Sequence, residues 1–121
     1  MRTMARFLLL TALSVSAFAA DVSYKGFRPD FIIDVRTPAE FAAGHIDGAI
    51  NIPVDQIEGK ISTLKELKPG SPVLLYCRSG RRSAIAASIL GARGYQQVVD
   101  GGGMDSLVHA IKVCQKGSKT C

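Results

Sequence analysis

Hydrophobic positions along this chain gather in four short runs separated by segments with a different spacing. The runs cover residues 31–35, 49–53, 73–77 and 96–100. The two most apolar, "FIIDV" and "VLLYC", have the composition of strands buried on both faces of a parallel sheet. The pattern therefore predicts four strands.

Helical signals fill the segments between and after these runs. The expected helices cover residues 38–44, 57–67, 81–94 and 104–114. The first begins with a capping box, in which Thr37 is the N-cap, Pro38 opens the helix and Glu40 stands at the third position. The second has apolar residues spaced by three or four, as on one face of a helix. Gly44 and Gly94 stand where glycine commonly ends a helix.

Strands that alternate with helices through short connections indicate an α/β fold. We expect three layers, with helices on both faces of a small, mostly parallel sheet. Residues 20–121 are expected to form a single domain, because the chain is too short for two independent cores. Residues 21–30 fit either a short edge strand or an irregular lead-in. The sequence does not predict an oligomeric state.

The first residues have the pattern of a secretory signal peptide. Arg2 and Arg6 precede an apolar run at 7–15, and residues 17–19 form a small-x-small cleavage site. A membrane anchor is the alternative, but the uncharged stretch has 14 residues. A bilayer span needs roughly 18 to 20 residues. We therefore expect cleavage of residues 1–19, a periplasmic mature chain, and no membrane attachment afterwards.

Composition and charge exclude several classes of function. The chain has 47% hydrophobic and 21% charged residues, as a globular protein does. Its formal net charge of +5 falls to +3 when the two arginines of the signal peptide are lost. This mild charge, without a long basic run, argues against nucleic acid as a partner. No set of Cys, His and carboxylate residues has metal-ligand spacing, so no metal is expected.

Three cysteines remain after cleavage, and export places them in an oxidising compartment where disulfides persist. Cys114 and Cys121 bracket a polar segment that can turn back on itself. A disulfide between them would stabilise the fold by roughly 2 to 3 kcal/mol in the chain-entropy model. This pairing would leave Cys77 as a free thiol.

Cys77 closes the third apolar run, and "CRSGRR" leads directly into the next helical segment. Ligands of parallel α/β sheets bind beyond the carboxyl ends of the strands, and backbone N–H groups at helix starts bind anions. Gly80 permits a tight turn, while Arg78, Arg81 and Arg82 add positive charge. We therefore predict an anion-binding loop that lowers the pKa of the Cys77 thiol and makes it a nucleophile without a general base.

The alternative for this loop is a buried structural cysteine followed by a solvated basic turn. The nucleophile hypothesis requires two features of the structure. The sulfur must not be sealed in the interior, and the loop must form a concave nest of donors around it.

These residues, with "IDVRTPAEFAAGHIDGAINIP" and "GYQQVVDGGG", resemble the single-domain rhodaneses, a family of sulfurtransferases. The resemblance runs from about Phe31 to Leu107 and is strongest to the small periplasmic rhodaneses of the phage-shock type. It implies a rhodanese-like fold in which Cys77 is the catalytic residue and carries a persulfide. The family usually has a tryptophan where this chain has Leu107.

The resemblance also implies the remaining parts of the site. The residues of the loop that would bind thiosulfate and the persulfide are Arg78, Ser79, Gly80, Arg81 and Arg82. A small-molecule sulfur donor and a thiol or cyanide acceptor would react in a ping-pong cycle, and no cofactor is implied.

Two other functions stay open at this point. Phosphatases and arsenate reductases of related fold carry an arginine six positions after the cysteine; here that position is Ser83, and Arg82 comes one residue too early. The chain could also be a persulfide carrier or a binding module for another exported protein. Turnover of thiosulfate and cyanide distinguishes an enzyme from a carrier.

Asp34 and Arg36 lie at or just past the end of the first strand and are expected at the rim of the same pocket. Our hypothesis is that Asp34 braces the loop by accepting hydrogen bonds from Arg82 or Ser83. An ordinary turn aspartate is the alternative.

Three further features have structural rather than catalytic interpretations. His45 is expected in a turn, and His109 in the last helix has no catalytic context. The triplet 101–103 lacks the spacing of a phosphate-binding loop. We expect it to let a loop pass close to the Cys77 pocket.

Overall fold

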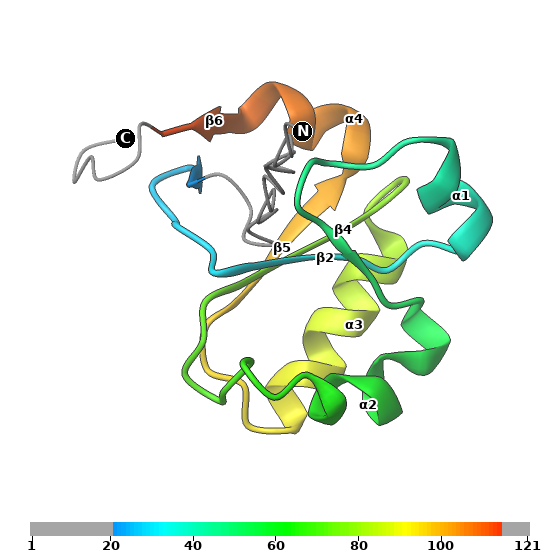
Figure 1. The fold of residues 1–121 in the computed structure, drawn as a ribbon, viewed down its shortest axis with the longest axis vertical. Coiled ribbons are helices and arrows are strands. Elements are labelled where there is room, and N and C mark those ends of the chain that lie inside the picture. Colours follow the sequence, from blue (N-terminus) through cyan, green and yellow to red (C-terminus); the bar gives the residue numbers. More distant parts are fainter. Residues whose placement is uncertain (1–20, 115–121) are drawn as a thin grey trace, which may run out of the picture.

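The computed structural model describes residues 21–114 (Figure 1). The expected signal peptide, residues 1–19, and Cys121 lie outside the described residues. Within the described range, no helix has the length and apolar character needed to cross a membrane.

A four-stranded parallel sheet forms the centre of the fold, in the order β3-β2-β4-β5. Its strands are β2 (Phe31–Asp34), β3 (Ile50–Asn51), β4 (Val73–Cys77) and β5 (Val98–Gly103). Every residue of β4 is buried, as its uniformly apolar sequence predicts. The expected mostly parallel sheet is confirmed.

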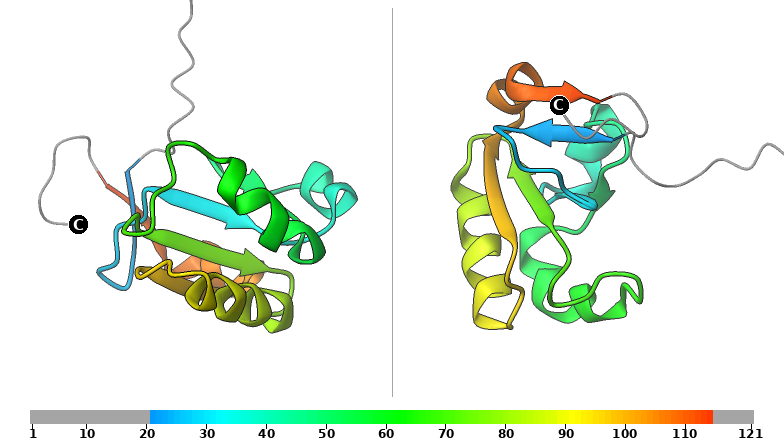
Figure 2. Two further views of the ribbon diagram at one scale, coloured as in Figure 1. Left: turned by 90° about the horizontal axis from the view of Figure 1, so that it is seen from below. Right: turned by 90° about the vertical axis from the view of Figure 1, so that its left-hand side faces the viewer.

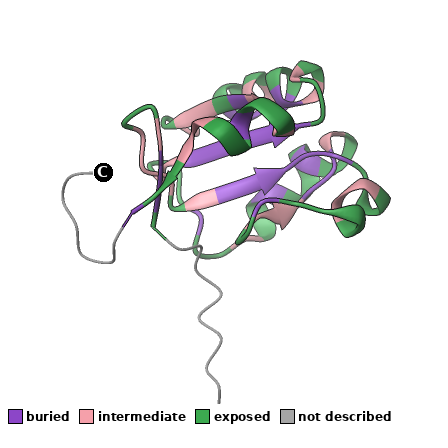
Figure 3. Cartoon of the chain, turned by 90° about the horizontal axis from the view of Figure 1, so that it is seen from above, coloured by how far each residue is buried: buried purple, intermediate pink, exposed green. Residues whose placement is uncertain are grey.

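Figure 1 shows the sheet between two outer layers. One layer contains α2 (Ile57–Lys60) and α3 (Arg81–Ala92), and the other contains α4 (Met104–Ala110) and a ribbon of two short strands. The two sides of the sheet have separate clusters of buried apolar residues. Figure 3 shows that the central strands β2 and β4 are mostly buried. The expected three-layer α/β fold is confirmed.

Alternation along β4 assigns each side chain to one of these layers. Val73, Leu75 and Cys77 belong to the cluster with α2 and α3, whereas Leu74 and Tyr76 belong to the cluster with α4. Successive residues of a strand point to opposite faces of the sheet. Cys77 and its neighbour Tyr76 therefore lie on opposite sides of the sheet.

Helix α1 (Pro38–Ala43) begins as the sequence predicts. The Thr37 hydroxyl accepts a hydrogen bond from the Glu40 N–H, and the Glu40 carboxylate accepts one from the Thr37 N–H, both at 3.2 Å. Gly44 follows the helix with a φ of 152°. The capping box and the glycine stop are both confirmed.

The expected helix at 57–67 is wrong in its extent. The α-helical part ends at Lys60 and is flanked by two 3₁₀ turns, η1 (Val54–Gln56) and η2 (Ile61–Thr63). Ile57, Ile61 and Leu67 of the apolar stripe are nevertheless buried. The stripe thus identified the buried positions, but a chain that bends between short turns buries them as well as one long helix would.

The final segment also differs from the prediction. The helix expected to reach residue 114 ends at Ala110, and β6 (Ile111–Val113) pairs antiparallel with β1 (Val22–Tyr24). This ribbon resolves the ambiguity of residues 21–30, which contain a short strand. The triplet 101–103, expected as a loop, instead ends β5.

Candidate active site

Cys77 ends β4, and the chain turns there into α3 through a short loop. The Gly80 N–H donates a hydrogen bond to the Cys77 Sγ at 2.9 Å, and the Ser83 hydroxyl lies 3.5 Å from the same sulfur. The Ser83 hydroxyl accepts a hydrogen bond from the Cys77 thiol and donates one to the Gly80 carbonyl at 3.1 Å. Gly80 has a φ of 97°, in the left-handed region that glycine adopts without strain. The loop therefore curves around the sulfur and forms the expected nest of donors.

Two opposing effects act on the Cys77 thiol. Burial raises its pKa, because a charged sulfur loses hydration. Hydrogen bonds from the Ser83 side chain and from the backbone N–H groups of Ser83, Gly80 and Ser79 lower it. Their combined effect is larger, so the pKa of Cys77 lies below that of an ordinary thiol. The nest thus favours a thiolate.

The other requirement, a sulfur that is not sealed in the interior, is not met in this conformation, because Cys77 is 0% exposed. Its backbone lies beside the end of β5, where Cys77 is in register with Gly103. A methyl group added at Gly103 would lie 2.8 Å from the Arg78 carbonyl oxygen, which shows how closely β5 approaches the loop. The expectation that the glycine triplet passes close to the Cys77 pocket is confirmed. A reagent can reach the sulfur only if the loop or the end of β5 moves.

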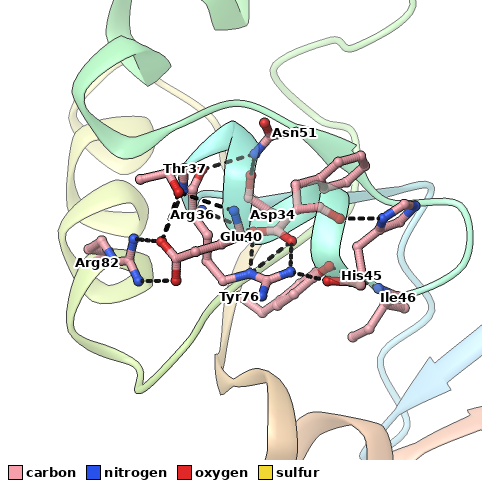
Figure 4. A network of polar contacts seen from close by, with 11 residues as sticks. Asp34, Arg36, Thr37, Glu40, His45, Ile46, Asn51, Tyr76 and Arg82 are labelled. Carbon is pink, nitrogen blue, oxygen red and sulfur yellow. Dashed lines mark hydrogen bonds and ion pairs between the residues drawn. The ribbon is translucent and has the colours of Figure 1, made fainter.

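The three loop arginines differ in their environment. Arg78 and Arg81 are exposed and make no ion pair within residues 21–114. Arg82 is half-buried and binds the Glu40 carboxylate through two hydrogen bonds of 2.7 and 3.0 Å (Figure 4). This pair lowers the pKa of Glu40 to about 2. This pair was not predicted from the sequence, since Glu40 already had a local role in the capping box.

Asp34 does not brace the loop as we expected. Its carboxylate accepts hydrogen bonds from the backbone and guanidinium of Arg36, the shortest at 2.6 Å (Figure 4). Asp34 is in register with Tyr76 in the parallel sheet, so its side chain points to the face of Tyr76. Cys77 and Ser83 face the other side. The prediction was wrong because it did not consider which face each position occupies.

Arg36 is 7% exposed and connects this ion pair to the end of α1. Its guanidinium also donates to the Gly44 carbonyl at 2.7 Å and lies 5.7 Å from the centre of the Tyr76 ring. Arg36 therefore holds the turn after α1 against the carboxyl edge of the sheet.

Tyr76 and Asn51 were not identified from the sequence. The Tyr76 hydroxyl accepts a hydrogen bond from the Ile46 N–H at 3.0 Å, and burial, followed by a hydrogen bond to Asp34, raises the pKa of Tyr76. The Asn51 side-chain amide donates to the backbone carbonyls of Asp34 and Arg36. The available signal was the Tyr76 hydroxyl, which stands in an otherwise apolar strand and therefore needs a buried hydrogen-bond partner.

Neither histidine forms a hydrogen bond with the Cys77 sulfur within the described residues. His45 stacks on Phe41 with ring centres 3.7 Å apart, and one of its ring nitrogens lies 2.9 Å from the Phe41 carbonyl oxygen. This contact stabilises the turn after α1, as expected. His109 is exposed on α4. Among the described residues, no group of three or more His, Cys, Asp or Glu could hold a metal ion.

A pocket of about 380 Å³ opens beside the Cys77 loop, between α1 and the start of α4. Its lining residues are Arg36, Glu40, Ala43, Gly44, Arg78, Met104 and Asp105. The pocket has the size of a site for a small organic molecule. It carries both positive and negative side chains.

Comparison with known proteins assigns the family. The family model of the rhodanese-like domain matches residues 17–107. The chain belongs to this family. Several of its curated relatives are named sulfurtransferases, in agreement with the resemblance carried by the loop and by the stretches around α1 and β5.

Two curated proteins illustrate the range of relatives of this rhodanese-like chain. Thiosulfate sulfurtransferase PspE of Escherichia coli K12 is 36% identical over 91 residues, which are 75% of this chain and 86% of that protein. The putative sulfur carrier protein YrkF of Bacillus subtilis is 33% identical over 69 residues. This second match covers 57% of the chain and 36% of the relative, so it concerns one part of a longer protein.

A solved structure supports the same fold. A rhodanese with anions from E. coli superposes with a TM-score of 0.61 at 34% sequence identity. The match covers 68% of this chain and 95% of that one. The rhodanese-like fold of this chain is therefore established by both sequence and structure.

Proposed function

We propose that this rhodanese-like protein is an exported thiosulfate sulfurtransferase in which Cys77 carries the transferred sulfur. In the first half-reaction the Cys77 thiolate attacks the outer sulfur of thiosulfate. The sulfur–sulfur bond of thiosulfate breaks, sulfite leaves with the bonding electron pair, and Cys77 becomes a persulfide. In the second half-reaction cyanide or a thiolate attacks the outer sulfur of the persulfide, and Cys77 is released as a thiolate.

The observation that carries this proposal is the hydrogen bond of 2.9 Å from the Gly80 N–H to the Cys77 Sγ. It comes from a loop that also places the Ser83 hydroxyl oxygen 3.5 Å from the sulfur and lowers the pKa of the thiol. The same donors suit an anionic outer sulfur, because hydrogen bonds to charged acceptors are stronger than those to neutral ones. Arg78, Ser79 and Arg81 extend the loop and are assigned to binding of the thiosulfate dianion.

The enclosed sulfur adds a step to this cycle. Cys77 is 0% exposed, so the loop between β4 and α3 must open or shift before thiosulfate can reach it. The pocket next to Arg78 gives the direction from which reagents arrive. Such local openings are common in loops of enzymes that enclose their reactants.

Steady-state turnover of thiosulfate and cyanide tests the proposal directly. Wild-type protein should form thiocyanate with ping-pong kinetics, and Cys77→Ser should form none. Thiosulfate alone should raise the intact mass by about 32 Da, the mass of one sulfur, and cyanide should remove it. Wild-type protein that gains no sulfur from thiosulfate would contradict the proposal.

A persulfide carrier is the second candidate, and the same enclosed sulfur favours it. A thiol without exposed surface is suited to receive sulfur from a partner protein that opens the loop, and one relative is named a putative sulfur carrier. A carrier would accept sulfur from a cysteine desulfurase used as probe but show no turnover with thiosulfate and cyanide. The enzyme would show both.

We further propose that residues 1–19 direct export and are removed, and that Cys114 and Cys121 form a disulfide in the mature protein. Cys114 is buried directly after β6 (Ile111–Val113). Secretion of the full chain should yield a periplasmic product whose mass corresponds to a start at Ala20. Peptide mapping without reduction should recover the peptides of Cys114 and Cys121 as one species, and Cys77 as an unlinked thiol.

A further inference from the structure

The pocket beside the Cys77 loop has charges that the proposed chemistry with thiosulfate does not use. Two of its charged residues are already neutralised within the fold. Arg36 binds Asp34 at 2.6 Å, and Glu40 binds Arg82 at 2.7 Å. The charges left for a ligand are those of Arg78 and Asp105, which have no ion-pair partner among the described residues.

Arg78 and Asp105 come to this pocket from different elements. Arg78 directly follows Cys77, whereas Asp105 is in the first turn of α4, after the glycine triplet. Both are exposed, and both line the same cavity of about 380 Å³. A cation and a carboxylate across one small cavity are complementary to a molecule that carries both charges itself.

We propose that this pocket is the acceptor site of the enzyme and that it selects zwitterionic amino-acid thiols, for which cysteine is the probe. The proposal rests on the function proposed above, because it assigns the acceptor of the persulfide formed on Cys77. Arg78 binds the α-carboxylate and Asp105 the α-ammonium group. Met104 and Ala43 provide the apolar wall along which the thiol-bearing carbon lies.

The transfer step balances with the groups present. The acceptor thiol loses its proton to solvent, and its thiolate attacks the outer sulfur of the Cys77 persulfide. The sulfur–sulfur bond breaks, its electron pair leaves with Sγ, and the outer sulfur departs as the persulfide anion of the acceptor. The Cys77 thiolate is then held by the Gly80 N–H and the Ser83 hydroxyl.

Arg78 can serve both half-reactions without conflict. In a ping-pong cycle sulfite leaves before the acceptor enters, so the two anionic groups never compete for the guanidinium at the same time. Asp105 has no favourable role toward thiosulfate, because like charges repel. Asp105 is therefore the residue that distinguishes an acceptor site from a site for thiosulfate alone.

Four small thiols test the contributions of the ammonium group and the carboxylate separately. Cysteine carries both, N-acetylcysteine lacks the ammonium group, cysteamine lacks the carboxylate, and 2-mercaptoethanol lacks both. Protein is first loaded on Cys77 with thiosulfate, or with polysulfide where thiosulfate fails, and loading is verified by intact mass. Loss of the extra sulfur is then followed in single turnovers, with each rate corrected for the thiolate fraction of the acceptor.

We expect cysteine to be the fastest acceptor of the wild-type protein. Asp105→Asn should lower the ratio of the cysteine rate to the N-acetylcysteine rate by about three- to tenfold, the range of a partly exposed ionic contact. Asp105→Lys should reverse this preference. Asp47→Asn, which removes an exposed carboxylate outside this pocket, is the matched control and should leave the ratio unchanged.

S-methylcysteine keeps both charges but cannot react, so it tests binding independently of transfer. It should slow the reaction with cysteine in the wild-type protein and lose most of this effect in Asp105→Asn. An unchanged ratio in Asp105→Asn, or an equal loss with all four thiols, would overturn the acceptor site. Failure of thiosulfate to load Cys77 would instead count against the proposed donor, and the polysulfide-loaded protein would still decide on the acceptor.

Discussion

Single donors around Cys77 determine how readily its thiol ionises. Burial opposes ionisation, and the hydrogen bonds of Ser83, Gly80 and Ser79 more than compensate for it. Most of these donors are backbone N–H groups, which no substitution removes without moving the chain. The Ser83 hydroxyl, 3.5 Å from the sulfur, is a side-chain contribution that can be deleted, together with its hydrogen bond to the Gly80 carbonyl.

We predict that Ser83→Ala raises the pKa of the Cys77 thiol, because a hydrogen-bond partner of the sulfur is lost. A donor to the thiolate is lost while burial is retained, so a higher pH is needed to form the same fraction of thiolate. The rate of alkylation by iodoacetamide, measured against pH, reports this value. Ser88→Ala on the exposed side of the same helix is the control and should not move the profile. An unmoved profile in Ser83→Ala would remove Ser83 from the nest.

For single residues, the sequence predicted the location in a strand, loop or helix better than it predicted the hydrogen-bond partner of the side chain. The strand-end location of Cys77 and its loop followed from local signals, namely an apolar run, a glycine and a helix start. The partner of Asp34 did not, because it depends on the face to which the side chain points and on the register with Tyr76. The partner of Glu40 is 42 positions away in the chain, and only the tertiary fold brings Arg82 to it.

Between elements, the pair of Glu40 and Arg82 ties α1 to the start of α3. The carboxylate has its pKa lowered from the ordinary 4.5 to about 2, first by hydrogen bonding to Arg82. A lowered pKa means that the unfolded state binds the proton more strongly than the folded state. The resulting stabilisation is therefore complete above about pH 4.5 and is lost as the pH falls toward 2.

We predict that Glu40→Gln lowers the free energy of unfolding at pH 7 by about 1 kcal/mol, the scale of a partly exposed ion pair. The difference from wild type should close between about pH 4.5 and 2, where Glu40 itself becomes protonated. Urea denaturation at several pH values measures this convergence. Glu58→Gln, which breaks the more exposed pair with Arg93, should change stability less. A difference that is independent of pH would show that the charge of Glu40 is not responsible.

The end of β5 and the Cys77 loop form the second contact between elements. Gly103 lies against the Arg78 carbonyl, and an added Cβ would come within 2.8 Å of that oxygen. We predict that Gly103→Ala destabilises the protein by about 1 to 3 kcal/mol, as overpacking in a tight contact does, and slows sulfur loading by displacing the loop. Thermal unfolding and the loading rate measure the two effects.

Gly91→Ala is the matched control for this substitution. Gly91 lies in α3, has no atom within 4 Å of its added Cβ, and needs no positive φ. It should therefore be neutral or stabilise by up to about 1 kcal/mol, since alanine favours the helix. Equal behaviour of the two variants would contradict the close packing at Gly103.

The same contacts explain which elements the sequence could predict. Helices α1 and α3 and the central strands followed from caps, glycine stops and apolar runs, which are local. The end of α4 did not, because Leu107, Ile111 and Cys114 are spaced as on a helix face. The pairing of β6 with β1, at the other end of the chain, outweighs that spacing and sets the boundary at Ala110.

For the molecule as a whole, the end of β4 joins both layers of the fold to the site. Cys77 faces α3, whereas Tyr76 faces the layer of α4 and receives the hydrogen bond from Ile46. Figure 2 shows the helices and the ribbon around the same set of parallel strands. The motion that exposes Cys77 must therefore occur between packed layers of the fold. Before that motion, only long-range electrostatic forces can act between the protein and an approaching reagent.

Charge over the whole molecule supplies such a force. The formal net charge is +5, or +3 without Arg2 and Arg6 of the proposed signal peptide, and the exposed Arg78 and Arg81 concentrate positive charge beside the Cys77 loop. Thiosulfate is a dianion, so its approach is favoured at long range. We predict that the second-order rate of sulfur loading falls several-fold as the ionic strength rises from about 0.01 to 0.3 M, because the Debye length shortens from about 30 Å to less than 10 Å.

Iodoacetamide, which is neutral, reacts with the same sulfur and provides the control for this effect. Its reaction, like that of thiosulfate, requires opening of the loop and ionisation of Cys77, but a neutral reagent is not attracted by the positive charge. The rate of alkylation should therefore change much less over the same range of salt. Arg81→Gln should flatten the salt dependence of thiosulfate, because it removes one unpaired charge near the loop without touching the Sγ donors. Equal salt dependence for both reagents would mean that salt acts on loop opening or on the thiolate, and that the arginines do not attract the donor.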